Sequence, residues 1–182
     1  AMHSEAQHLT RLVEDLRTLS LADAGELSLN LQPVEPAAML HRVVAAYQHR
    51  ADQQNIQLGV EADPTLPQIQ ADPERLVRVL KNLVSNALRY TPAQGQITLT
   101  ALTRPDALQL QVIDTGSGID PQALPNIFNR FFRADESRQQ SSGESGLGLA
   151  IAKAIVEAHH GRVSVDSVMG EGTTFTIVLP RR

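Results

Sequence analysis

One helix, expected between Asp72-Pro73 and Pro92, constrains the fold of this chain more than any other feature. An aspartate before a proline is a strong helix start, because the carboxylate accepts from free amides and proline suits the first helical position. Read at 100° per residue, the helix has one apolar face that needs a core to cover it. That face is formed by Leu76, Leu80, Leu83 and Ala87.

A second, polar stripe runs along the same helix. Asn82, Asn86 and Arg89 fall on one side of it, and Tyr90 follows directly. Carboxamide oxygens are hard neutral ligands that suit Mg²⁺, and an arginine suits a phosphate. Asparagine is also common on solvated helix faces, so these residues alone leave a binding site and a plain surface equally open.

The remaining patterns predict a mixed architecture. Apolar residues three and four apart indicate further helices over 4–24, 36–54 and 146–160. Alternating apolar residues indicate strands over 27–31, 56–61, 68–70, 97–101, 108–112, 163–165 and 174–179. Because several strands follow one another, we expect an α+β fold, a two-layer sandwich of one sheet with helices on one face, rather than a doubly wound fold.

The N-terminal helix is amphipathic and ends at Gly25. Its apolar stripe is narrow, so we interpret it as one arm of a helical hairpin or a dimer seam, in preference to packing on its own domain. The stripe therefore predicts dimerisation or association of the chain. It is formed by Leu9, Leu12, Val13, Leu16 and Leu19.

Two glycine-containing turns suggest a ligand. Asp114 ends a strand and is followed by Gly116 and Gly118. Its carboxylate would accept a hydrogen bond from an adenine amino group, while the glycines admit a flat base, although a tight turn capped by Asp114 explains the pattern equally well. Gly146 and Gly148 open the last helix, where free amides favour phosphate. They form neither a P-loop nor a dinucleotide fingerprint.

Three of the four phenylalanines lie at positions 128, 131 and 132, directly before a polar, glycine- and serine-rich stretch over 134–145. We expect this stretch to be mobile, and the aromatic cluster to form a hinge or docking patch, with core packing as the default for at least one ring.

Composition narrows the class of protein. A net charge of −4 and the lack of a basic cluster before Arg181-Arg182 argue against a nucleic-acid partner. The chain has no cysteine, which excludes disulfides and thiol catalysis. No apolar run reaches the roughly 20 residues of a membrane helix, and no signal peptide is visible. The six histidines show no metal-ligand spacing; we expect surface or capping roles for all, with helix-end roles for His159 and His160.

Taken together and in this order, the motifs resemble the catalytic, ATP-binding domain of bacterial sensor histidine kinases. The resemblance covers roughly residues 27–180 and implies the ATPase fold shared with gyrase-type enzymes, which hold ATP between helices and a lid. The matching segments are 82–91 (N box), 114–119 (G1 box), 128–133 (F box), 146–149 (G2 box) and 170–175, the glycine-rich segment before the last strand.

The resemblance also implies a domain organisation. Residues 1–25 look like the second helix of a dimerisation and phosphoacceptor hairpin, and residues 26–182 like the catalytic domain. No His-Glu-Leu-Arg-like phosphoacceptor box occurs, so its helix is expected to precede residue 1. The resemblance implies a cytoplasmic domain of an inner-membrane sensor, a homodimer in the full-length protein, and a response regulator as partner.

The resemblance implies catalytic roles for four residues and ATP and Mg²⁺ as cofactors. Asn86 would hold the metal, with Asn82 at the phosphates or the metal's water shell. Arg89, where the family often has lysine, would contact phosphate, and Arg133 is a candidate for the γ-phosphate. Asp114 would accept from the adenine amino group, helped by Gly118 and by Thr174 through water. The implied nucleotide contacts also include Tyr90, Gly116, Ile119, Phe132, Gly146, Leu147, Gly148 and Leu149.

Two further implications concern the lid, expected over 134–145 and anchored at its start by Phe131 and Phe132. First, Glu144-Ser145 follows Gly143, where many members have Gly-Gly or Gly-Thr, which places a carboxylate beside the phosphates. This keeps a non-catalytic nucleotide-binding regulatory module open as an alternative. Second, gyrase-type relatives hydrolyse ATP with a glutamate one turn before the metal-binding asparagine. Here Asn82 stands in that place and cannot act as a base, which favours a kinase over a hydrolase.

Overall fold

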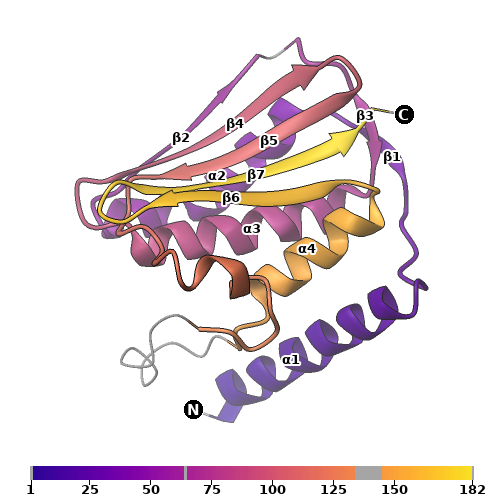
Figure 1. The fold of residues 1–182 in the computed structure, drawn as a ribbon, viewed down its shortest axis with the longest axis horizontal. Coiled ribbons are helices and arrows are strands. Elements are labelled where there is room, and N and C mark those ends of the chain that lie inside the picture. The colour runs from indigo at the N-terminus through magenta and orange to yellow at the C-terminus, as the bar shows by residue number, and fades with distance from the viewer. Residues whose placement is uncertain (1, 64, 134–144, 182) are drawn as a thin grey trace.

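The computed structural model describes residues 2–63, 65–133 and 145–181. Five strands form one sheet in the order β2-β4-β5-β7-β6, and three helices cover one of its faces (Figure 1). Among the described strands of this sheet, only β2 and β4 pair in parallel. The strands are β2 (Gln57–Ala62), β4 (Gln96–Arg104), β5 (Ala107–Asp114), β6 (Arg162–Val168) and β7 (Gly172–Pro180), and the helices are α2 (Pro36–Gln53), α3 (Pro73–Tyr90) and α4 (Gly148–Ala158). A short 3₁₀ turn, η1 (Leu124–Asn126), follows β5. The predicted two-layer α+β sandwich is confirmed.

Helix α3 lies at the centre of the helical layer. Asp72 caps it, because its Oδ1 accepts from the amide of Arg75 at 3.0 Å. The apolar face expected from the sequence is buried, with Leu80 and Leu83 fully shielded from solvent. Strand β5 opposes it with alternating buried residues, of which Leu110 is one. Core packing therefore fixes which side of α3 remains for the polar stripe.

The sheet prediction was wrong in one respect. A second sheet of two short strands, β1 (Gln32–Val34) and β3 (Ile69–Ala71), lies apart from the main one, and the strand expected over 27–31 does not form. Leu27 contacts the core without any strand pairing. An extended segment that turns every second side chain inward shows the same alternation as a strand, so the pattern cannot reveal whether a partner is present. Pro33 fits β1 because edge strands tolerate proline.

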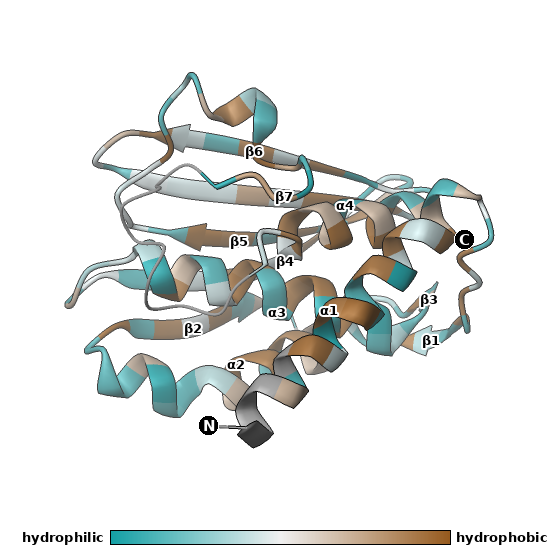
Figure 2. Ribbon diagram, turned by 90° about the horizontal axis from the view of Figure 1, so that it is seen from below, coloured by the Kyte–Doolittle hydropathy of each residue, from teal (hydrophilic) through white to brown (hydrophobic). Residues whose placement is uncertain are grey.

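Helix α1 (Met2–Asp23) lies against the helical layer and contacts α4 (Figure 2). Leu19, near its C-terminal end, is buried, and Leu12 is half-buried against the core. The packing on its own domain that the sequence disfavoured therefore occurs in this half of the helix. Part of the stripe stays open to solvent: Leu9, Val13 and Leu16 are 58%, 66% and 46% exposed.

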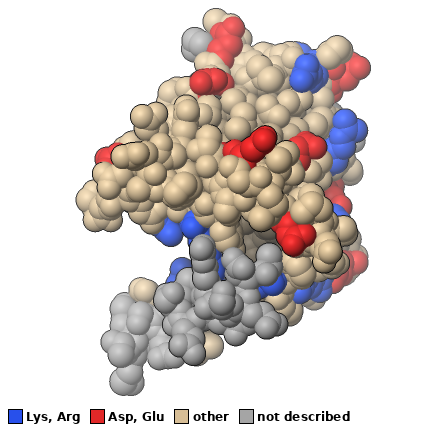
Figure 3. Space-filling view, turned by 60° about the vertical axis from the view of Figure 1, so that its left-hand side comes forward, with Lys and Arg blue, Asp and Glu red and all other residues tan. Residues whose placement is uncertain are grey.

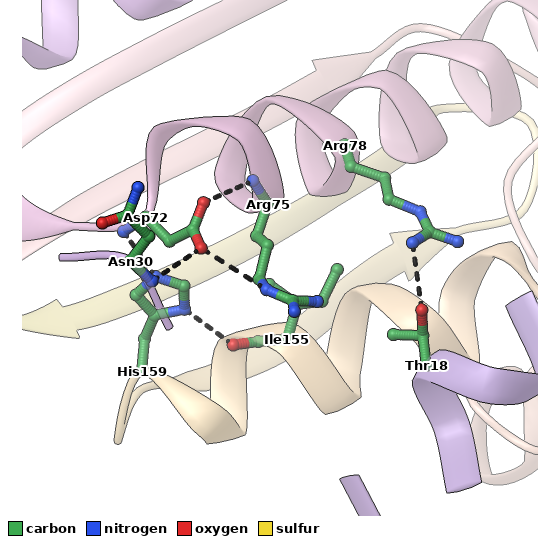
Figure 4. Close-up of polar contacts among 7 residues, drawn as sticks. All are labelled: Thr18, Asn30, Asp72, Arg75, Arg78, Ile155 and His159. Atoms are coloured by element: carbon green, nitrogen blue, oxygen red, sulfur yellow. Dashed lines mark hydrogen bonds and ion pairs between the residues drawn. The ribbon is translucent and has the colours of Figure 1, made fainter. Parts of the chain in front are cut away.

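His159 has the helix-end position expected for it, as the C-cap residue of α4, but it is not a surface residue. It is buried where α4 ends, and its Nδ1 donates to the carbonyl of Ile155 at 2.8 Å (Figure 4). Its Nε2 accepts from the amide of Asp72 at 3.0 Å. The carboxylate of Asp72 also accepts from the amide of Asn30 at 3.0 Å. The neutral imidazole thus joins the end of α4 to the start of α3, and the carboxylate of Asp72 joins the start of α3 to the segment before β1.

This arrangement predicts acid sensitivity. Burial lowers the pKa of His159, outweighing the opposing effects of the Ile155 carbonyl and of Asp72. The unfolded chain therefore takes up the proton first, so the stabilisation is complete above the ordinary pKa of 6.5 and is lost as the pH falls below it. Urea unfolding at a series of pH values should show less acid destabilisation in His159→Gln than in wild-type. The exposed neighbour His160 provides the control. In His160→Gln, the free energy of unfolding should fall with decreasing pH as steeply as in wild-type. An equal dependence on pH in all three proteins would show that buried His159 is not the source of the acid sensitivity.

Candidate functional site

The polar stripe of α3 forms the floor of a cleft of about 530 Å³. Arg78, Asn82, Asn86 and Tyr90 line it at four-residue steps, which places them on one side of the helix. Cationic side chains gather at the hollow seen in Figure 3. The cleft is also lined by α1 through Arg11, Leu12, Glu14 and Asp15, by α2 through Tyr47, by Lys81, Ser85 and Arg89 of α3, by Ile119, Ile127, Phe132 and Arg133 after β5, and by Ser145, Gly146, Gly148 and Leu149 at the start of α4.

Asn82 connects the two helices that border the cleft. Its Nδ2 donates to the carbonyl of Gly148 at 2.9 Å, which holds the middle of α3 against the start of α4. Asn86 lies one turn further along and is half-buried in the cleft. The guanidinium carbon of Arg89 lies 5.4 Å from the centre of the Tyr90 ring. The cleft floor therefore combines neutral carboxamides with cations, a set that suits an anionic ligand.

The phenylalanine cluster divides into three roles. Phe128 packs edge-on against Phe175 with ring centres 6.3 Å apart, and Phe132 is half-buried against the core. Phe131, which is expected with Phe132 to anchor the start of the lid, has a side chain that is 61% exposed. Its backbone makes the connection, since its amide donates to the carbonyl of Gly146 at 3.0 Å. This bond joins the segment before residue 134 to the turn before α4.

The expected lid lies almost wholly outside the described residues. Positions 134–144, including Gly143 and Glu144, are not described, and Ser145 is the first residue after them. Leu147, expected to contact the nucleotide, has no exposed surface and belongs to the core. Because Leu147 directly precedes α4, its buried side chain holds the turn before this helix against the core.

Asp114 ends β5 and is 6% exposed. Its Oδ1 accepts from the amide of Gly116 at 2.8 Å. Burial raises the pKa of Asp114, and hydrogen bonds from the amides of Gly116 and Thr173 oppose this rise. The loop that follows is tied to the end of α3, because the amide of Ser117 donates to the carbonyl of Tyr90 at 3.1 Å. Asp114 therefore lies at the Tyr90 end of the stripe, beyond the residues that line the cleft.

The turn between β6 and β7 covers the loop after Asp114. The amide of Ile119 donates to Oγ of Ser167 at 2.9 Å, and the amide of Gly170 donates to the carbonyl of Ser117 at 2.9 Å. Gly118 has a φ of +71°, and a Cβ there would overlap the carbonyl oxygen of Val168. Only glycine fits this conformation and this close approach together. The sequence did not indicate the part played by Ser167.

Strand register corrects the threonine expected beside Asp114. Thr173 pairs directly with Asp114, whereas Thr174 pairs with Ile113. Directly paired residues of antiparallel strands point to the same face, so Thr173 shares the buried face with Asp114 and Thr174 lies on the other face. The sequence contained the signal: counting back in steps of two from the apolar Phe175 puts position 173 on the inner face.

Comparison with known proteins shows to which class of protein this fold and this site belong. A profile of the histidine kinase-, DNA gyrase B- and HSP90-like ATPases matches residues 71–182. The sensor histidine kinase CusS of Escherichia coli O157:H7 is 39% identical over 184 residues, which cover 100% of this chain and 38% of CusS. The circadian input-output histidine kinase CikA of Synechococcus elongatus is 34% identical over 184 residues, covering 100% of this chain and 24% of CikA.

A solved structure agrees with these relatives. Full-length ShkA in complex with AMPPNP has a TM-score of 0.87 and 32% identity, covering 98% of this chain and 37% of that one. The chain belongs to the family of histidine kinase-like ATPases, within the catalytic domains of bacterial sensor histidine kinases. It spans 24% of the length of CikA and 38% of that of CusS. In the part that the structure describes, no helix is both long and apolar enough to cross a bilayer.

Proposed function

We propose that this chain binds Mg-ATP in the α3 cleft and transfers the γ-phosphoryl group to a histidine of a dimerisation domain. The observation that carries the proposal is the stripe of Asn82, Asn86 and Tyr90, which begins beside the Asp114 loop and continues along α3 beside the cationic side chains. ATP has the matching order of groups, a neutral base at one end and a polyanion at the other. The ATPase family and the AMPPNP bound to ShkA support this assignment.

The Asp114 loop beyond the Tyr90 end of the stripe suits the adenine base, and the cations and amides along the cleft suit the phosphates. In the proposal, the adenine amino group donates to Asp114, with Thr173 rather than Thr174 beside it. Arg89 and Arg133 contact the phosphates electrostatically. The free amides near Gly146 and Gly148, at the start of α4, bind a further phosphate oxygen. These groups orient the terminal phosphoryl group, which is the main task of an enzyme that transfers one.

The donor set also fits the proposed metal. Among the described residues, no three acidic or histidine side chains gather, so a cage made by the protein alone does not form there. Mg²⁺ is commonly held by very few protein oxygens together with substrate phosphates, and Asn86 supplies such an oxygen. Bound Mg²⁺ would neutralise phosphate charge during transfer.

Asn82 favours phosphoryl transfer over hydrolysis. Its amide nitrogen donates to Gly148, a bond that a glutamate at this position would not make when ionised. An amide also cannot take a proton from water at neutral pH, whereas an imidazole acceptor is already a nucleophile. A regulatory module that only binds nucleotide is the second candidate, because Glu144-Ser145 follows Gly143 in the sequence where many members of the family have Gly-Gly or Gly-Thr.

One experiment separates these candidates. The chain is mixed with γ-labelled ATP, Mg²⁺ and a fragment that carries the histidine helix of the hairpin. Transfer of label to that histidine is expected, and binding of ATP without transfer supports the regulatory module. Phosphate release that Asn82→Ala abolishes supports a hydrolase. A covalently joined hairpin and catalytic domain serves as the control for poor assembly of the two pieces.

Asp114→Asn is expected to weaken ATP binding by about 1–3 kcal/mol, because a buried acceptor is replaced in part by a donor. Titration calorimetry measures the change directly. Thr174→Ala, on the opposite face of β7, is the matched control and should leave affinity within about 0.5 kcal/mol of wild-type. Equal affinities for wild-type and Asp114→Asn would remove Asp114 from the adenine site.

We further propose that α1 is the second helix of the dimerisation hairpin, in a sensor anchored in the inner membrane that passes phosphate to a response regulator. The exposed Leu9, Val13 and Leu16 support association through α1. Sedimentation velocity should show a mass that rises with concentration, and Leu9→Lys combined with Leu16→Lys should suppress it. A wild-type monomer at the highest concentrations would contradict the dimer proposal.

A further inference from the structure

Arg78 continues the polar stripe of α3 by one turn beyond Asn82, towards α1. The four residues Arg78, Asn82, Asn86 and Tyr90 follow one another at four-residue steps, which correspond to about 6 Å each along the helix axis. Arg78 is therefore about 18 Å along the axis from Tyr90, at the opposite end from the Asp114 loop. A ligand whose base lies beside Asp114 directs its terminal phosphate towards this end.

In the structure Arg78 is bound by α1. Its Nη2 forms an ion pair with Oδ1 of Asp15, and its Nη1 donates to Oγ1 of Thr18 at 3.2 Å (Figure 4 draws the latter bond). The Arg78 and Asp15 side chains are only 33% and 23% exposed, so solvent screens their attraction incompletely. Both line the cleft. Lys81, also in the cleft, forms no ion pair within the described part of the chain, so of these two cations α1 binds Arg78.

We propose that Arg78 is a phosphate-binding residue that Asp15 masks while α1 is docked. The inference rests on the proposed binding of ATP. With α1 docked, the Asp15 carboxylate takes the position of an anion next to the guanidinium and cancels its charge. When α1 moves away, Arg78 becomes available to the terminal phosphate of the bound nucleotide. The position of α1 thereby sets the affinity for ATP relative to ADP, because only the longer phosphate chain extends towards Arg78.

The second ion pair of α1 places the same helix at the other border of the cleft. Nη2 of Arg130 contacts both carboxylate oxygens of Asp23 at 2.6 Å. Arg130 precedes Phe131, whose amide bonds to Gly146, so this contact also joins the last residue of α1 to the turn before α4. Because this pair is exposed, it contributes little to stability and does not oppose the release of α1 strongly.

The test measures the affinities of the full chain for ATP and ADP, each with Mg²⁺, by titration calorimetry. Asp15→Asn keeps the shape of the side chain and removes the charge that masks Arg78. We expect ATP to bind about fivefold more tightly and ADP to change by less than about twofold. The double variant Asp15→Asn with Arg78→Met should lose the gain for ATP. Glu14→Gln is the matched control, since it removes the same charge from an adjacent carboxylate that forms no ion pair in the described part of the chain.

Each result decides between specific interpretations. A gain for ATP in Asp15→Asn that disappears with Arg78→Met and is absent in Glu14→Gln supports the proposal. Equal gains for ATP and ADP, or a gain that persists in the double variant, would mean that loosening α1 merely widens the cleft, and would overturn it. Unchanged ATP affinity in Asp15→Asn overturns it as well. If wild-type and all variants fail to bind ATP, the proposed function itself is wrong and the role of Arg78 is rejected with it.

Discussion

Asn86→Ala is expected to reduce phosphoryl transfer from ATP to the histidine-bearing fragment by at least about 100-fold. The side chain is half-buried on the cleft floor, between Asn82 and Tyr90, and its carboxamide oxygen is the ligand proposed for the metal. The described part of the protein has few oxygen ligands to replace it, since no acidic cluster is present there. Single-turnover transfer of label, measured at saturating ATP, reports the loss in the chemical step.

Comparison with Asn82→Ala separates catalysis from folding. Asn86 forms no hydrogen bond with another described side chain, so Asn86→Ala should leave the midpoint of thermal unfolding unchanged. Asn82 bonds to Gly148, and Asn82→Ala should therefore also lower the free energy of unfolding by about 1 kcal/mol. Transfer by Asn86→Ala within about threefold of wild-type would exclude this residue as the metal ligand.

The contrast between these two asparagines also shows which features of the site can be predicted from the periodicity of the sequence. The buried face of α3 and the shared stripe of Asn82 and Asn86 depend only on the helical repeat, and the sequence was sufficient to predict both. The bond from Asn82 to Gly148 spans 66 positions and depends on how α3 meets α4. No local pattern contains that contact, so the supporting role of Asn82 emerged only from the structure.

Most of the predictions that were wrong or missing concern contacts between residues that are far apart in the sequence. The alternation over 27–31 is a real property of that segment, but a strand also needs a partner, and the partner of β3 is Gln32–Val34. The helix-end position of His159 could be predicted, but its burial against Asp72 could not, because Asp72 is 87 positions away in the sequence. Arg78 was overlooked for the same reason, because its partner Asp15 is 63 positions away. Thr173 differs, since strand alternation alone was sufficient to prefer it over Thr174.

Gly172→Ala is expected to lower the free energy of unfolding by about 3 kcal/mol or more. Gly172 begins β7 with a φ of +129°, a conformation that residues with a side chain rarely adopt. A Cβ at this position would also overlap the carbonyl oxygen of Asp114 on the neighbouring strand. The Cβ position is fixed by the backbone of residue 172 and the oxygen belongs to the backbone of Asp114, so the overlap can be relieved only by moving β5 away from β7. Urea unfolding measures the loss.

Two other glycines separate the effect of the positive φ from the effect of the overlap with Asp114. Gly170 has a φ of +80°, but a Cβ added there would meet no described atom within 4 Å, so Gly170→Ala should cost only about 1–2 kcal/mol of backbone strain. Gly59 in β2 has neither a positive φ nor a close neighbour, and Gly59→Ala should change stability by less than about 0.5 kcal/mol. If Gly172→Ala lowers the free energy of unfolding no more than Gly170→Ala does, the close approach to the Asp114 carbonyl does not contribute to the need for glycine at position 172. If Gly172→Ala lowers it by more, the fraction of the variant that remains folded should also bind ATP more weakly. The added Cβ displaces the backbone of Asp114, the residue proposed to recognise the base.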